Sequence, residues 1–344
     1  MSAATFQSVD AFEAIELYFE RGLTDGLPVV PPRPEAVKRF IETVGRDPDE
    51  VLITFSETNM QCTVEAAAVN AVMAGCKPEY FPVVVATVEG WNDPRWGPTN
   101  VYLSTASTGG AGILQIVNGP IRNELEMNSG VGLFGPGFRA NATIGRAARL
   151  IMLNALGMTP KVFDMSIMGH PGKYTYCIAE AEEESPWEPF HVERGFRAEE
   201  STVTVLPGKG PVPVDERNSD TPEPILDAVA TVMPHAFGTG VYAIVMGTEH
   251  AQIIARNGWT KRMVKEYLFE KTRRELPPGA PRRGNVRTVD GVDYRYLVRV
   301  PDDIAVIVAG GGNGGLTAVI PTHVYNVPPG DLVTVPIKRA APAG

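Results

Sequence analysis

The chain has 344 residues, of which 44% are hydrophobic and 21% charged, as in an ordinary globular protein with one large domain or two medium ones. Its formal net charge of −9 excludes nonspecific nucleic-acid binding, because no basic stripe is present to neutralise phosphates. No apolar run is long enough to cross a membrane, and no basic start leads into an apolar signal segment. We therefore expect a cytoplasmic protein with no membrane partner.

The first third of the chain predicts short helices and strands separated by glycine and proline. Thr63 is a suitable N-cap for one helix, and Gly75 ends it. Residues 81–88 form an apolar run that fits a buried helix or a strand; its β-branched content favours a strand, but its period does not decide. The other predicted elements are helices over 12–21 and 33–44 and strands over 51–55 and 111–117.

The rest of the chain alternates predicted strands with predicted helices. The strands are expected over 174–179, 201–206, 241–246 and 304–309, and the helices over 225–233, from 248 onward and over 260–273. A mobile basic loop is expected to follow, as far as Gly291. The alternation predicts an α/β fold with mixed sheets, flanking helices and glycine-rich loops at strand ends. The polar, proline-rich stretch 208–222 divides a main domain, 1–210, from a second α/β subdomain, 211–344.

The most informative segment is a glycine-rich loop, 130–137, that leads directly into an amphipathic helix. Free N–H groups and the positive end of the helix dipole, with Asn128, Arg139 and Asn141 nearby, suit an anion such as a carboxylate or phosphate. The alternative interpretation of this segment is a tight loop followed by a helix whose arginine face is solvated and binds no anion. The letters GVGLFG match a dinucleotide fingerprint, but the preceding segment is polar, so no cofactor is predicted. The glycines at 310–315 offer a second anion loop or a flexible turn.

Three arginines share one face of the predicted helix, namely Arg139, Arg146 and Arg149. Their guanidinium groups repel one another unless acids or an anionic ligand lie among them. A network of salt bridges and a substrate-clamping arginine both satisfy this requirement. We take Arg146 as the candidate clamp.

Candidate groups for proton transfer gather between residues 170 and 182. His170 and Lys173 lie in a loop that glycine and proline constrain, and Glu180 and Glu182 form a carboxylate pair or hard metal ligands. A solvated acidic turn is the alternative for the glutamates, so a divalent metal is left open and its ligands are unknown. Cys76 is a candidate nucleophile, although its place after a helix end does not by itself favour a thiolate. The five histidines show no metal-binding spacing: His170, His191, His235, His250 and His323.

Several phrases of the sequence look familiar when taken together: TDGLPVVPP (24–32), VNAVMAGCKPEYFPVV (69–84), NGPIRNEL (118–125), GPGFRANATIGRA (135–147), PGKYTYCIAEAEEESPWEP (171–189) and VIVAGGGNGG (306–315). The chain resembles the larger companion of the UGSC-type (seleno)proteins, small bacterial proteins with a Cys/Sec-Gly-Ser-Cys motif. The resemblance implies such a small protein as a partner and supplies no reaction. The residues that match its phrases are Asn70, Cys76, Lys77, Arg139, Asn141, Arg146, Lys173 and Glu180.

The sequence favours an enzyme that acts on a small anionic metabolite by addition–elimination, as a lyase or hydratase, or by hydrolysis. Asn128, Arg139, Asn141 and Arg146 would bind the anion. A subunit that presents substrate to a separate thiol or selenol redox protein is one alternative, and a noncatalytic binding or assembly protein is another. Apolar segments at 27–31 and 81–85 lead us to expect a homo-oligomer.

Overall fold

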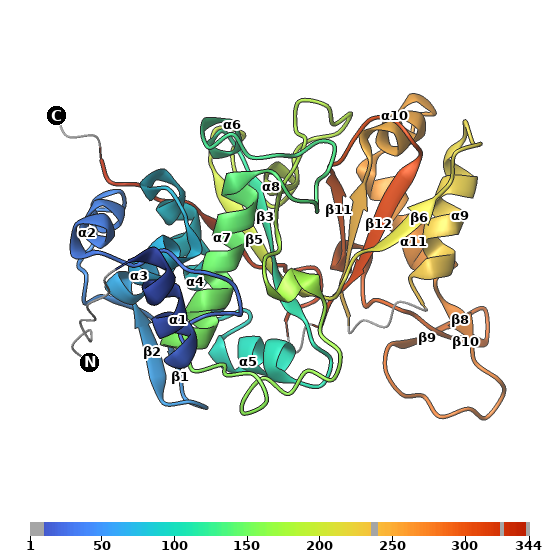
Figure 1. Cartoon of the computed structure of the whole chain (residues 1–344). Helices are drawn as coiled ribbons and strands as arrows, with labels where there is room; N and C mark the ends of the chain where they lie inside the picture. Colours follow the sequence, from blue (N-terminus) through green and yellow to red (C-terminus); the bar gives the residue numbers. More distant parts are fainter. Residues whose placement is uncertain (1–9, 235–239, 324–326, 342–344) are drawn as a thin grey trace.

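A computed structural model describes residues 10–234, 240–323 and 327–341. Within these ranges two four-stranded sheets form the centre of the molecule, each covered by helices (Figure 1). Each of these sheets contains one parallel and two antiparallel pairs of strands. The predicted α/β fold with mixed sheets and flanking helices is confirmed.

The first sheet has the strand order β13-β5-β3-β4. Its strands are β3 (Gly112–Asn118), β4 (Cys177–Ala179), β5 (Thr202–Gly208) and β13 (Thr334–Pro336). Strands β3 and β4 run parallel, so their carboxyl ends lie at the same edge. Every residue of β3 and β5 is buried, which explains why both segments read as continuous apolar runs instead of alternating ones.

Helices α4 and α7 pack against this sheet, and α3 packs against both of them. The helices of this half are α1 (Ala11–Glu20), α2 (Pro34–Glu42), α3 (Val64–Ala74), α4 (Phe81–Asn92), α5 (Pro98–Ala106), α6 (Ile121–Glu124), α7 (Arg139–Leu150) and α8 (Phe190–Glu193). A π-helical turn, Ile151–Ala155, extends α7, and a hairpin of β1 (Val51–Phe55) and β2 (Met60–Thr63) precedes α3. As predicted, the Thr63 hydroxyl accepts a hydrogen bond from the Ala66 N–H, and Gly75 ends α3 in the left-handed conformation.

The apolar run 81–88, for which a strand was favoured, is helical and forms most of α4. Pro82 lies in the first turn of this helix, where its missing N–H costs nothing. The helix is buried almost all round, between the sheet and hairpin and helices α3 and α7, so packing outweighs the β-branched preference. Because 81–85 is buried here, it is not free to contact another copy of the chain, whereas Leu27 and Val30 remain exposed.

The second sheet has the strand order β11-β7-β12-β6. Its elements are β6 (Val212–Asp215), α9 (Pro222–Val232), β7 (Tyr242–Met246), α10 (Thr248–Arg256), α11 (Lys261–Lys271), β11 (Ile304–Val308) and β12 (Leu316–Pro321). Alternate residues of β7 face opposite sides, as strand geometry requires. Tyr242 and Ile244 enter the core beneath the helices, and Ala243 and Val245 enter a larger core shared with the first half.

The predicted boundary near residue 210 falls between the two sheets, but the chain crosses it more than once. The Ala181 N–H donates to the Val308 carbonyl over 2.8 Å, joining the end of β4 to β11. The His323 N–H donates to the Pro207 carbonyl, also over 2.8 Å, and strand β13 then returns to pair with β5. The large core therefore contains side chains from both predicted domains.

The expected mobile basic loop after α11 is partly a small sheet. Its strands are β8 (Arg274–Glu275), β9 (Val286–Val289) and β10 (Val292–Arg295), with β10 in the middle. Arg282 pairs with Asp293 at 2.6 Å, and the Arg273 guanidinium lies over the Tyr294 ring. These contacts order a segment whose charge suggested only a solvated surface. No helix in the described ranges has both the length and the apolar character needed to span a lipid bilayer.

Gly145 allows helix α7 to lie close to the segment that leads into β4. A Cβ atom at this position would come within 2.6 Å of the Tyr176 backbone nitrogen. Helix propensity alone predicts that Gly145→Ala stabilises the protein by about 1 kcal/mol. The close packing reverses the sign, and we expect a loss of about 2 kcal/mol in the free energy of unfolding, measured by urea denaturation.

The matched control is Gly130→Ala, because a Cβ there would make only an ordinary contact, 3.8 Å from the Asn128 side-chain oxygen, and the φ of Gly130 is not positive. This variant should unfold like the wild type. A Gly145→Ala variant at least as stable as the wild type would show that α7 is not held this closely to the sheet.

Candidate functional site

The residues predicted to bind an anion at the start of α7 hold the chain together in this structure. The Asn141 side-chain oxygen accepts from the Asn128 N–H at 2.9 Å, and its amide nitrogen donates to the Asn128 carbonyl at 3.0 Å and the Cys177 carbonyl at 3.3 Å. Asn141 therefore ties the glycine loop to β4. The cavity described below lies beside the middle of α7 and not beside residues 130–137.

Arg139 and Arg146 also make contacts within the protein. Arg139 donates two hydrogen bonds to the Gly75 carbonyl, at 3.1 and 3.0 Å, and so covers the end of α3. Two nitrogens of Arg146 donate to the buried Asp25 carboxylate, at 2.9 and 2.8 Å, and one of them also donates to the Leu27 and Pro28 carbonyls. Such a bidentate pair satisfies the guanidinium without a ligand.

Cys76 lies beneath the surface, and burial raises the pKa of its thiol to about 12. A neighbouring Thr143 hydrogen bond and the charges of Arg139 and Arg146 oppose this shift but do not cancel it. The thiolate is the nucleophilic form, so the environment of Cys76 disfavours nucleophilic attack at neutral pH.

Glu180 and Glu182 follow the carboxyl end of β4, and both accept hydrogen bonds within the protein; Glu182 accepts from the Asn118 amide at 2.9 Å and the Gly119 N–H at 2.7 Å. Glu180 is fully buried and accepts from the Asn118 amide at 2.5 Å and the Phe190 N–H at 2.7 Å. Burial raises the pKa of Glu180, although the Lys261 ammonium 3.9 Å away opposes the shift. Within the described ranges no three histidine, cysteine, aspartate or glutamate side chains are arranged to hold a metal ion.

The glycine loop after β11 holds a carboxylate that belongs to the protein itself. The Gly314 and Gly315 N–H groups both donate to Glu249 at 2.7 Å. The backbone N–H groups of this loop therefore do bind a carboxylate, as one of the two interpretations predicted. That carboxylate is the Glu249 side chain on α10.

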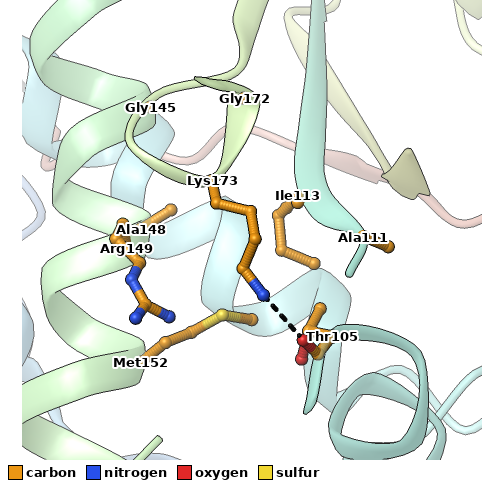
Figure 2. Close-up of a pocket in the computed structure, with 10 residues that line it drawn as sticks. Thr105, Ala111, Ile113, Gly145, Ala148, Arg149, Met152, Gly172 and Lys173 are labelled. Atoms are coloured by element: carbon orange, nitrogen blue, oxygen red, sulfur yellow. Dashed lines mark hydrogen bonds between the residues drawn. The ribbon is translucent and has the colours of Figure 1, made fainter. Parts of the chain in front are cut away.

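A small, partly enclosed cavity lies where α7, the end of α5 and the loop before β4 meet the start of β3. Its volume is about 20 Å³, enough for one or two water-sized groups. Figure 2 shows the Lys173 ammonium and the Arg149 guanidinium ending in the same space above Met152. The lining residues are Thr105, Ala111, Gly112, Ile113, Gly145, Ala148, Arg149, Met152, Gly172 and Lys173.

Lys173 comes from a 3-10 turn, Pro171–Lys173, and reaches back to the end of α5. Its ammonium donates to the Thr105 carbonyl at 3.0 Å and the Ser166 hydroxyl at 2.6 Å, and it approaches the two Asp164 oxygens to 2.9 and 2.7 Å. Burial lowers the pKa of Lys173, and Arg149 lowers it further, against the opposing effect of Asp164. The pKa of Asp164 is itself below its ordinary value: burial would raise it, but hydrogen bonds from Lys173 and Ser166 outweigh that effect.

Arg149 is the least paired of the three arginines on α7. The described structure gives its guanidinium one hydrogen bond, to Asp164 at 3.4 Å, although only 13% of the side chain is exposed. The remaining donors are available to a ligand in the cavity. Two cations thus face one carboxylate, which leaves an excess of one positive charge in a partly apolar space.

His170 contributes by holding the loop that carries Lys173. Its Nδ1 accepts from the Gly172 N–H at 3.1 Å, and its Nε2 lies 3.0 Å from the Gly208 carbonyl. Burial lowers the pKa of His170, and the charge of Lys173 adds to the shift. The ring is therefore neutral at pH 7. Of the other histidines, His191, His250 and His323 lie elsewhere and are buried, and His235 lies outside the described residues.

Sequence reasoning placed Lys173, His170 and Arg149 among the candidates but missed the groups that connect them. Asp164, Ser166 and Thr105 lie in segments without a motif, and only the fold brings them to Lys173. No protein-family model matches the chain, and a search of curated proteins gives no match either.

The buried contacts of Glu180 make a prediction about stability. Glu180→Ala removes the acceptor of two buried donors and leaves Lys261 without this counter-charge, so the free energy of unfolding should fall by about 3 kcal/mol. Urea denaturation measures the change, and Glu184→Ala, at an exposed position nearby, is the control. Equal stability of the two variants would contradict a structural role for Glu180.

Proposed function

We propose that the protein is an enzyme that binds a small carboxylate in the cavity between Arg149 and Lys173 and transforms it by addition–elimination, as a lyase or hydratase does. The observation that carries the proposal is the under-paired Arg149 guanidinium, which shares a buried space with a lysine of lowered pKa. Perturbed ionisable groups in a cavity are typical of catalytic sites.

Binding of the anion follows from the charges around the cavity. The Arg149 guanidinium offers planar donors that match a carboxylate, and Asp164 balances only one of the two cations. Ile113, Ala148 and Met152 contribute apolar side chains to the lining of the cavity. Charge–charge attraction is stronger in such a space than in bulk solvent.

Proton transfer follows from the hydrogen bonds behind the cavity. Lys173 donates to the Ser166 hydroxyl, which donates in turn to Asp164 at 2.5 Å. This chain lets the lysine lose a proton and regain it while the substrate stays in place. Addition–elimination next to a carboxylate needs one group that takes a proton from carbon or oxygen and returns it, and Lys173 is that group.

A titration with pyruvate tests the position of the anion site. Arg149→Lys should weaken binding of pyruvate at least tenfold, because an ammonium cannot copy the planar fork. Isothermal titration calorimetry measures the dissociation constant. Arg139→Lys, at the exposed start of the same helix, should bind within twofold of the wild type. Loss of binding in Arg139→Lys with retention in Arg149→Lys would place the anion at the helix N-terminus and overturn the proposal.

One observation favours the second candidate, a subunit that presents substrate to a thiol or selenol protein. The segment beside Ser166 carries three apolar side chains exposed to 54, 74 and 90%, namely Met165, Ile167 and Met168. Apolar side chains gathered on a surface next to a site are typical of a docking face. The resemblance noted above supplies the partner, a small Cys/Sec-Gly-Ser-Cys protein. This role is compatible with carboxylate binding in the same cavity.

This candidate has its own test. Met168→Asp should reduce capture of the small Cys-Gly-Ser-Cys protein at least tenfold, because a carboxylate replaces the most exposed apolar side chain of the segment. Phe12→Asp on α1 is the control, since Phe12 is 81% exposed in another part of the chain. Undiminished capture by Met168→Asp, measured by co-purification and surface plasmon resonance, would exclude this face as the docking site.

A further inference from the structure

We propose that Lys173 is a covalent catalyst that forms an imine with the carbonyl carbon of a small 2-oxo acid. The inference rests on the proposed function, because it names the substrate class and the chemistry of the same cavity. Its basis is the placement of one amine, one guanidinium and a proton-transfer chain around a space with an apolar wall.

The amine has the surroundings that a nucleophilic lysine needs. Only 14% of the Lys173 side chain is exposed, and its Nζ projects into the cavity beside Arg149 (Figure 2). A lysine that is desolvated, or that lies next to another cation, holds its proton less tightly and becomes a nucleophile near neutral pH. The direction of its pKa shift agrees with this placement.

The hydrogen-bonded chain balances the protons of the reaction. One proton of the Lys173 ammonium passes to Ser166 as the Ser166 proton passes to Asp164, which leaves a neutral amine. Its lone pair attacks the carbonyl carbon, so a carbon–nitrogen bond forms. One proton of the attacking amine and the proton held on Asp164 pass to the former carbonyl oxygen, and this carbon–oxygen bond breaks to release water and leave a protonated imine. The products are the imine and one water, with no oxidant, reductant or other co-reactant.

The walls of the cavity set the substrate class. Arg149 recognises the carboxylate, and the apolar wall of Ala148 and Met152 accepts a methyl group or hydrogen. Two glycines, Gly112 and Gly145, line the space, and a Cβ at either would meet backbone atoms at 2.6 Å, so backbone closes that side. The enclosed part of the cavity, about 20 Å³, holds only one or two water-sized groups, so an acid of two or three carbons must leave some of its atoms in the open mouth.

Reductive trapping tests the imine directly. The full-length protein is incubated with pyruvate and sodium cyanoborohydride, which reduces an imine to a stable secondary amine, and the adduct is located by mass spectrometry of peptides. We expect one adduct per chain, at Lys173. Its rate of formation should rise with pH around a midpoint below the 10.5 of an ordinary lysine, whereas surface lysines respond only near that value.

Matched variants separate Lys173 from other lysines. Lys173→Arg should give no adduct, and Lys161→Arg, at an exposed position, should label like the wild type. Ser166→Ala keeps the contact between Lys173 and Asp164 but breaks the chain, so trapping should slow at least tenfold. Arg149→Gln should slow trapping with pyruvate at least tenfold but leave trapping with hydroxyacetone, which has no carboxylate, within twofold. Thermal melts of each variant establish that it is folded.

Labelling that spreads evenly over surface lysines, or that persists in Lys173→Arg, overturns the inference. If pyruvate binds in an Arg149-dependent manner by calorimetry but no adduct forms at Lys173, the imine is wrong and carboxylate binding stands. If pyruvate neither binds nor labels the protein, the inference falls together with the proposed anion site.

Discussion

The candidate site depends on one buried carboxylate, that of Asp164, and on the cations that balance it. Burying a carboxylate is costly unless charged donors surround it. Asp164 has Lys173 at 2.7 Å, Arg149 at 3.4 Å and the Ser166 hydroxyl at 2.5 Å. These contacts join helix α7, the loop before β4 and, through the Thr105 carbonyl, the end of α5. The same network that fixes the loop also creates the charge imbalance and the proton path on which the proposed chemistry relies.

The sequence predicted those elements whose signals are local. Some features need only neighbouring residues to form, and these appear as expected. They are the N-cap of α3 at Thr63, the end of α3 at Gly75 and the strand over 201–206. The sequence left residues 81–88 open between helix and strand, because the burial of α4 on all sides is a property of the whole fold. The strand β13 was missed since it is three residues long and acquires its partner 130 residues earlier in the chain.

The three arginines of α7 show why the site could be located only approximately from sequence. Their spacing placed them on one face, but it could not tell which one already had a partner. Arg146 finds Asp25, which lies 121 residues away in the sequence, and Arg149 finds Asp164 at a longer distance. A guanidinium with a bidentate partner is satisfied, and one with a single long contact is available. That difference moves the proposed anion site from the start of the helix to its middle, where Lys173 also lies.

A crystal structure of the protein soaked with pyruvate tests the central claim most directly, because it locates the anion without assuming a reaction. The account predicts density in the cavity, with the carboxylate on Arg149 and the carbonyl carbon next to the Lys173 amine. Density at the start of α7 beside Arg139, or a cavity that stays empty while pyruvate binds elsewhere, would contradict it.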